Sequence, residues 1–309
     1  MKKYAIKKEF FPFSHFTPPI NKSFLSLAAY FMKAPKMIFK DKEINIEKYL
    51  VKSYDNEQIE CLMISPNKVE DKLPCLIYIH GGGFVLKAAG YHYKNAVKYA
   101  KRLKCRVFFI NYRLAPKYPH PIFFEDCYYS VDWLFNHSEE LGIDKNRIGI
   151  AGDSAGSTLA VGMSIMVKER KHPIKFLFQM LPYPFLDARN NSESCKKYID
   201  TPMWNSRLST KIKDMTKVDK NNHNYLYYSP VELDNFDFFP PTYIETAEFD
   251  CLHDDGILFA ELLTKNGIEV MLNETKGTIH GFDIVQKAET TIMVIDDRIA
   301  FMSCFFNKK

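Results

Sequence analysis

The hydrophobic pattern of the chain changes near residue 73. Before that point, residues 24–32 predict an apolar helix, and residues 46–55 and 58–66 predict two strands joined by a hairpin at Asn56 and Glu57. After it, continuous apolar segments predict strands at 74–80, 105–112, 147–152, 175–183, 241–249 and 269–274. The segments between them predict helices at 91–103, 123–136, 157–171, 255–265 and 288–306.

This alternation predicts an α/β architecture. Strands that are apolar along their whole length are typical of a mostly parallel sheet covered by helices on both faces. The interval 186–239 breaks the rhythm, because it is polar, rich in Asn and Lys, and too long for a bare loop. We expect it to be an insertion over one edge of the sheet.

A serine lies where a predicted strand runs directly into a predicted helix, in the sequence GDSAG at 152–156. This is the G-x-S-x-G pattern in the strand–turn–helix context that gives it meaning. Gly152 and Gly156 allow a turn in which a Cβ would clash, so Ser154 is presented above the carboxyl edge of the sheet. A tight turn with a purely structural serine is the alternative.

Three consecutive glycines follow another strand, in HGGGF at 80–84. Such a run costs backbone entropy and suits a loop whose amides face a reacting oxyanion. We therefore expect the amides of Gly82, Gly83 and Ala155 to form an oxyanion hole, with His80 supporting the loop. A phosphate-binding loop is the alternative, but no Lys-Ser/Thr pair follows the glycines and no helix begins at the last one.

A serine nucleophile needs a base and an acid. Of nine histidines, His280 stands out because it follows the last predicted strand and precedes Gly281 and Phe282. In proteins with this nucleophile turn, the acid lies between the serine and the histidine along the chain. Asp250, just past a strand end, is the favoured candidate, and Glu248 is the second. Asp254 and Asp255 are expected instead to be the N-terminal cap and dipole partners of the following helix.

Composition narrows the class of protein. The 309 residues are 46% hydrophobic and 15% aromatic, enough for a large core. The net charge of +5 comes from dispersed lysines with acidic neighbours, which indicates solvated faces rather than a nucleic-acid surface. Seven cysteines without a CxxC spacing indicate reduced thiols and no zinc site. With no apolar run long enough to span a membrane, we expect a cytoplasmic protein that binds neither membrane nor nucleic acid.

The chain resembles the hormone-sensitive-lipase-like family of serine carboxylesterases, which have the α/β-hydrolase fold. The resemblance covers residue 45 to the C-terminus and rests on HGGGF (80–84), YRLAP (112–116), GDSAG (152–156), the acidic run 248–254 and HGF (280–282). It implies triad roles for Ser154, Asp250 and His280, oxyanion roles for Gly82, Gly83 and Ala155, and no metal or organic cofactor. Ser157 and Cys251 stand where the family usually has glycine and proline.

The resemblance also implies a small cap. We expect cap segments at 1–45 and 186–239, and an α/β-hydrolase catalytic domain formed by 46–185 and 240–309. Phe84, Trp204 and Phe282 are the candidates for the substrate pocket. Bulky rings restrict the depth of a pocket, and the N-terminal residues Phe10, Phe11, Phe13 and Phe16 could close the same side.

The sequence thus predicts a carboxylic ester hydrolase that acts on a small-molecule ester through an acyl-enzyme. Acetyl to butyryl esters are the expected substrates, because steric exclusion should outweigh the gain of about 0.8 kcal/mol per added methylene. A carbohydrate or xenobiotic deacetylase and an amidase or formamidase could use the same triad, and a non-catalytic small-molecule receptor is disfavoured by the complete triad. The sequence leaves a homodimer open.

Overall fold

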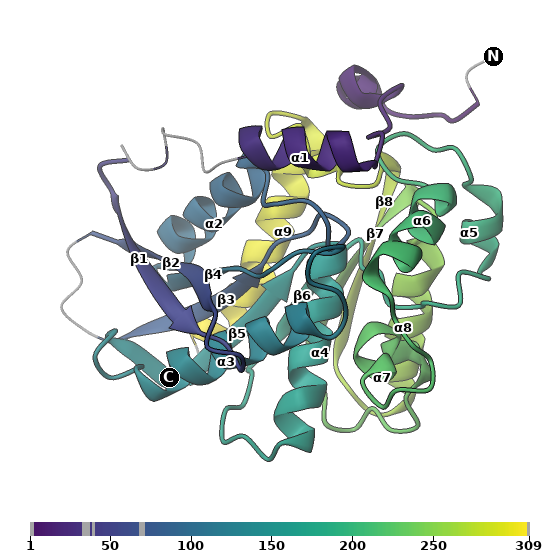
Figure 1. The fold of residues 1–309 in the computed structure, drawn as a ribbon. Coiled ribbons are helices and arrows are strands. Elements are labelled where there is room, and N and C mark those ends of the chain that lie inside the picture. The colour runs from purple at the N-terminus through teal and green to yellow at the C-terminus, as the bar shows by residue number, and fades with distance from the viewer. Residues whose placement is uncertain (1–2, 33–37, 39–40, 68–71, 308–309) are drawn as a thin grey trace.

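The computed structural model describes residues 3–32, 38, 41–67 and 72–307. Within these residues, eight strands form one twisted sheet in the order β1-β2-β4-β3-β5-β6-β7-β8 (Figure 1). Their bounds are β1 Ile44–Lys52, β2 Gln58–Pro66, β3 Leu73–Ile79, β4 Arg106–Asn111, β5 Ile143–Gly152, β6 Gln179–Pro182, β7 Thr242–Phe249 and β8 Val270–Ile279. β2 pairs antiparallel with β1 and β4, and all other pairs are parallel. The predicted mostly parallel sheet is confirmed.

Helices cover both faces of this sheet (Figure 1). The long helices are α2 Gly90–Leu103, α3 Ile122–Asn136, α4 Ala155–Glu169, α8 His253–Lys265 and α9 Glu289–Phe306. Residues of α3, α4 and α8 share a core with Ile77 and Ile79 of β3, whereas residues of α2 and α9 share a core with Leu76 and Tyr78. Because successive side chains of a strand point to opposite faces, an uninterrupted apolar strand fills both cores.

The insertion 186–239 contains α5 Glu193–Lys197, α6 Ser206–Thr216, α7 Tyr225–Tyr228 and the 3₁₀ turn η3 Pro230–Glu232. Its apolar side chains, among them Trp204, Ile212 and Tyr228, belong to the same core as α4 and α8. Further 3₁₀ turns are η1 Lys8–Phe13 and η4 Phe282–Ile284, and α1 Lys22–Phe31 lies near the N-terminus. The polar insertion therefore anchors its few aromatic residues in the main core.

Several strands differ in length from the prediction: β5 begins four residues earlier, at Ile143, and β1 ends three residues earlier, at Lys52. β6 is only four residues long, although the apolar segment 175–183 is longer. β8 continues to Ile279, five residues beyond the predicted end at 274, because the polar residues 275–278 carry no apolar strand pattern. In this extension the buried hydroxyls of Thr275 and Thr278 lie 2.7 Å apart and hydrogen-bond to each other, so the strand does not require apolar side chains there.

Candidate active site

Ser154 occupies the turn between β5 and α4. Its φ of 54° lies in the left-handed region, which costs free energy for any residue other than glycine. A Cβ at Gly152 would lie 2.2 Å from the carbonyl oxygen of Gly156, and a Cβ at Gly156 would lie 2.1 Å from that of Ile79. The two glycines therefore let strand and helix approach closely enough to form this turn.

Ser154, His280 and Asp250 form a hydrogen-bonded chain. The Oγ atom of Ser154 lies 2.8 Å from Nε2 of His280, and Nδ1 of His280 lies 2.6 Å from Oδ2 of Asp250. A carboxylate only accepts, so Nδ1 carries a proton and Nε2 accepts the Ser154 hydroxyl. The other carboxylate oxygen accepts the amide of Leu252 at 3.0 Å, which fixes the Asp250 side chain. The three residues follow β5, β8 and β7, at the carboxyl edge of the sheet.

The second acid candidate has a different partner. Oε2 of Glu248 accepts the amide of Gly277 at 2.7 Å, in the β8 segment that precedes His280. Of the two carboxylates, Asp250 is the one that contacts the imidazole.

Asp254 and Asp255 lie in the first turn of α8, as expected of partners for the helix dipole, but the expected capping is wrong. The N-cap residue, Leu252, makes no side-chain cap, and the Asp254 amide is instead bound by Oγ of Ser194 at 3.1 Å. Oδ2 of Asp255 accepts the amides of Leu186 and Asp187, both at 3.1 Å, and Oδ2 of Asp254 accepts the amide of Ser194 at 2.7 Å. The two carboxylates therefore bind backbone amides of the insertion, which lies beside the first turn of α8.

The glycine loop follows β3 directly. Gly82 has a φ of 121° and Gly83 a φ of 60°, both in the region that favours glycine. A Cβ at Gly83 would lie 2.6 Å from the indole ring of Trp204, so any side chain there would displace that ring. Among the described residues, no hydrogen bond has the amide of Gly82, Gly83 or Ala155 as its donor. These amides are free to bind an anionic oxygen.

His80 supports this loop from below. Its ring stacks on Tyr112 with centroids 4.5 Å apart, and its Nδ1 lies 2.7 Å from the carbonyl oxygen of Gly81. The Tyr112 hydroxyl donates to the His80 carbonyl oxygen at 2.9 Å. Burial, aided by the neighbouring His92, lowers the pKa of His80 to about 3, so this imidazole stays neutral at physiological pH.

Asp153, which the sequence reading passed over, is a second support. One carboxylate oxygen accepts the Tyr78 hydroxyl at 2.8 Å, and the other lies 2.9 Å from Nε2 of His92. Nδ1 of His92 accepts the Ala89 amide, so Nε2 carries the proton and donates to Asp153. A Cβ at Gly81 would lie 2.5 Å from the Asp153 carboxylate. The Asp153 side chain, which precedes the nucleophile, thus packs directly against the glycine loop. Its position inside the GDSAG motif was the sequence feature that could have identified it.

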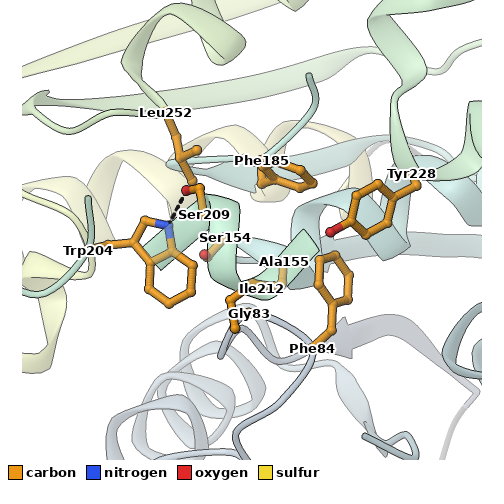
Figure 2. A pocket seen from close by; sticks show the side chains of 10 residues that line it. All are labelled: Gly83, Phe84, Ser154, Ala155, Phe185, Trp204, Ser209, Ile212, Tyr228 and Leu252. Carbon is orange, nitrogen blue, oxygen red and sulfur yellow. Dashed lines mark hydrogen bonds between the residues drawn. The ribbon is translucent and has the colours of Figure 1, made fainter. Parts of the chain in front are cut away.

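A narrow pocket opens beside Ser154 (Figure 2). Its volume is about 10 Å³, room for about one water molecule. Of the predicted pocket residues, Phe84 and Trp204 line it, but Phe282 does not; Phe282 packs against Phe10 and Tyr183. The remaining lining residues are Gly83, Ser154, Ala155, Phe185, Ser209, Ile212, Tyr228 and Leu252. Those from the insertion were missed because their sequence carries no motif.

The two departures from the family pattern are accommodated locally. The buried Ser157 hydroxyl donates to the carbonyl oxygen of Gly152 at 2.5 Å, within the nucleophile turn. The Sγ atom of Cys251 lies 3.7 Å from the Oγ atom of Ser209, which in turn accepts the indole N–H of Trp204 at 2.9 Å. Cys251, which follows Asp250, thus contacts two residues that line the pocket, Ser209 directly and Trp204 through Ser209.

The residues that the structure describes contain no group of three or more His, Cys, Asp or Glu side chains that could hold a metal ion. No helix of the described residues is long and apolar enough to cross a membrane.

Comparison with known proteins agrees with the fold and the site. Residues 76–284 match a family described by its alpha/beta hydrolase fold. Carboxylesterase NlhH of Mycobacterium tuberculosis is 33% identical over 247 residues, which cover 78% of this chain and 76% of that protein. Arylacetamide deacetylase of Bos taurus is 30% identical over 268 residues, covering 67% of each chain. A structure of a bacterial heroin esterase superposes with a TM-score of 0.87 at 25% identity, covering 98% of this chain and 99% of the other.

The fold, the Ser–His–Asp set and these relatives define a carboxylic ester hydrolase. The chain belongs to the hormone-sensitive-lipase-like family of the α/β hydrolases.

Proposed function

We propose that this esterase hydrolyses short-chain acyl esters, acetyl to butyryl, through an acyl-enzyme formed on Ser154. The observation that carries the proposal is the combination of the hydrogen-bonded chain from Ser154 to Asp250 with a pocket of about 10 Å³ beside the serine. The hydrogen-bonded chain supports the nucleophilic mechanism, and the pocket supports the limit on acyl length.

In the proposed reaction, Ser154 is the nucleophile and His280 the general base. Nε2 of His280 takes the hydroxyl proton as Oγ attacks the acyl carbonyl, and Asp250 holds the imidazole through Nδ1 and stabilises the imidazolium. His280 then returns the proton to the leaving alcohol. Water repeats the sequence on the acyl-enzyme, with the same imidazole as base, and releases the carboxylic acid.

The oxyanion of each tetrahedral intermediate is assigned to the amides of Gly82, Gly83 and Ala155. Their freedom from other hydrogen bonds and the left-handed backbone of the two glycines support this role. A donor placed at such an oxyanion lowers the activation free energy by about 3 to 4 kcal/mol. The rigid support from His80 and Asp153 avoids the cost of orienting the amides during the reaction.

The expected acyl preference follows from the pocket walls. Phe84, Phe185, Trp204 and Tyr228 enclose the space beside Ser154 with rigid rings (Figure 2). Each methylene that fits would contribute about 0.8 kcal/mol. The pocket has room for about one water molecule, so a longer acyl chain must displace the packed rings further, at about 1–3 kcal/mol or more. Steric exclusion therefore outweighs the hydrophobic gain.

A series of p-nitrophenyl esters from acetyl to decanoyl tests the proposal. We expect the highest kcat/KM between acetyl and butyryl, a steep decline beyond hexanoyl, and a burst of p-nitrophenol equal to the enzyme concentration with the fastest ester. Ser154→Ala should abolish the burst and the turnover while the protein keeps its thermal unfolding temperature. A preference for decanoyl esters would refute the length limit, and organophosphate labelling of another serine would refute the nucleophile.

Amide or acetyl-sugar hydrolysis is the second candidate function. The arylacetamide deacetylase relative favours an anilide substrate, because the same triad can attack an amide carbonyl. An acetanilide and a peracetylated sugar added to the same series distinguish the candidates. A kcat/KM for the anilide above that for p-nitrophenyl acetate would assign the protein as an amidase.

A further inference from the structure

A buried ion cluster lies behind the active site. Arg298 of α9 is only 1% exposed and binds two buried carboxylates. Its guanidinium contacts Glu245 of β7 through two bonds, of 3.0 and 2.6 Å, and Asp283 of η4 through one bond of 2.8 Å. The cluster therefore joins strand β7 to the consecutive elements η4 and α9, and Asp283 is only three residues from His280.

This cluster is expensive to bury. Removing ions from water is costly, and a pair of charges recovers that cost only with good geometry. Burial alone would lower the pKa of Arg298, but Glu245 and Asp283 outweigh it and raise that pKa above its usual value. The guanidinium is therefore charged, and it fixes both carboxylates. If the Arg298 cluster only filled space, apolar side chains of similar volume would do so with a smaller desolvation cost.

Tyr183 connects the cluster to the catalytic histidine. Its hydroxyl donates to Oδ1 of Asp283 at 2.6 Å, and its amide donates to the carbonyl oxygen of Glu245 at 2.5 Å. Burial raises the pKa of Tyr183 well above its usual value, so the hydroxyl keeps its proton and remains a donor. The ring contacts the imidazole of His280 edge to face, with centroids 5.0 Å apart.

The backbone around Tyr183 is also tied to the nucleophile. The carbonyl oxygen of Pro182, the preceding residue, accepts the amide of Ser154 at 3.0 Å. Tyr183 itself has a φ of 37°, an unfavourable value for a bulky residue that its neighbours must hold in place. One residue thus touches the histidine while its backbone adjoins the serine turn.

We propose that Tyr183 is a positioning residue for His280, held against the imidazole by the Asp283–Arg298 pair. Asp250 binds the imidazole at Nδ1 and Ser154 binds it at Nε2, and two such bonds leave the ring free to rotate about the line through these atoms. The Trp204 ring, with its centroid 5.8 Å from that of His280, lies against the imidazole as well. The Tyr183 ring restricts the rotation, so that Nε2 stays aligned with Ser154 Oγ and later with the leaving alcohol. A displacement of about 1 Å at a reacting group can cost about 100-fold in rate. The inference rests on the proposed function.

The chain offers a matched control. Tyr243 is fully buried, and its hydroxyl contacts Oε2 of Glu245 at 3.1 Å, at the opposite end of the same ion cluster. Its ring packs against Phe301 of α9. Tyr243→Phe removes a buried hydroxyl from the cluster just as Tyr183→Phe does, but from the branch that leads away from His280.

The experiment compares the two variants with the unaltered protein on p-nitrophenyl acetate. We expect Tyr183→Phe to lower kcat about 10- to 100-fold with KM within about twofold, because the loss is one of alignment rather than binding. Tyr243→Phe should lower Tm by a similar amount and leave kcat within about twofold. A second readout is the downfield proton resonance of the His280–Asp250 bond, which should broaden or shift only in Tyr183→Phe.

Each outcome decides the question. Equal kcat values for the two variants would overturn the proposal, and so would a loss confined to KM. If Tyr183→Phe does not fold, Asp283→Asn tests the same bond from the acceptor side, with the same expected fall in kcat and resonance change; kcat and resonance unchanged in that variant would overturn the proposal. Failure of the proposed function is distinct, because the unaltered protein would then turn over no more ester than Ser154→Ala.

Discussion

At the scale of single residues, the acid of the triad is the most testable assignment. Asp250 contacts His280 at 2.6 Å, whereas Glu248 binds the amide of Gly277. We expect Asp250→Asn to lower kcat by about 10⁴-fold, the loss seen when the orienting carboxylate of other triads is neutralised. Glu248→Gln should cost less than about 10-fold, since an amide oxygen can still accept from Gly277. Steady-state kinetics on p-nitrophenyl acetate gives both values, and the reverse ranking would move the acid role to Glu248.

The residues that the sequence identified are those with local constraints. Ser154, Gly82 and His280 each follow a strand and lie in short motifs, so spacing alone brings them to one edge of the sheet. Tyr183, Asp153 and the pocket residues of the insertion were not identified, because their roles depend on contacts between distant segments. Phe282 shows the converse: its neighbour His280 enters the site, but its own side chain points to Phe10.

At the scale of elements, strand β3 and its glycine loop depend on a neutral histidine. The pKa of His80 falls to about 3 in the fold, against about 6.5 in an unfolded chain. Between these pH values the unfolded chain binds a proton that the folded protein does not. The stabilising contribution is thus complete above about pH 6.5 and is lost as pH falls, at up to about 1.4 kcal/mol per pH unit.

We therefore expect the free energy of unfolding to fall less steeply in His80→Asn than in the unaltered protein between pH 6.5 and 4. Urea unfolding at pH 7, 5.5 and 4.5 measures this slope. His120→Asn is a useful comparison, because burial lowers the pKa of that histidine to about 4 and it lies outside the glycine loop. Both variants should reduce the slope, but only His80→Asn should also lower kcat. An unchanged slope in His80→Asn would show that this imidazole titrates normally.

The limits of sequence prediction also lie at this scale. Strands that are apolar on both faces were located to within a few residues, because the central strands of a covered sheet must bury both sides. β8 was cut short at 274, since its continuation buries the polar pair Thr275 and Thr278, whose hydroxyls bind each other, in place of apolar side chains. The start of α8 carried acidic residues typical of a cap, but the insertion uses them instead. Tertiary partners, which a local pattern does not contain, decided both cases.

At the scale of the whole molecule, the N-terminal segment joins two parts of the active site. The Phe16 carbonyl oxygen accepts the amide of Met203, next to the pocket residue Trp204, at 2.6 Å. The Glu9 carboxylate accepts the first amides of α9 at 3.0 and 3.3 Å. Phe10 packs against Phe282, two residues after His280. The segment therefore contacts both the insertion and the histidine loop, although its phenylalanines do not line the pocket.

Removal of residues 1–20 should consequently change both specificity and stability. Without the Phe16 carbonyl oxygen, Met203 and Trp204 lose a backbone anchor, and the wall beside Ser154 can move to admit longer acyl chains. We expect the ratio of kcat/KM for hexanoyl over acetyl esters to rise at least about fivefold, roughly 1 kcal/mol of relaxed steric exclusion. Glu9→Gln separates the two effects, because it weakens the α9 cap by about 1 kcal/mol and lowers Tm while leaving the Met203 contact intact. An unchanged acyl ratio after truncation would show that the insertion holds Trp204 without help from the N-terminus.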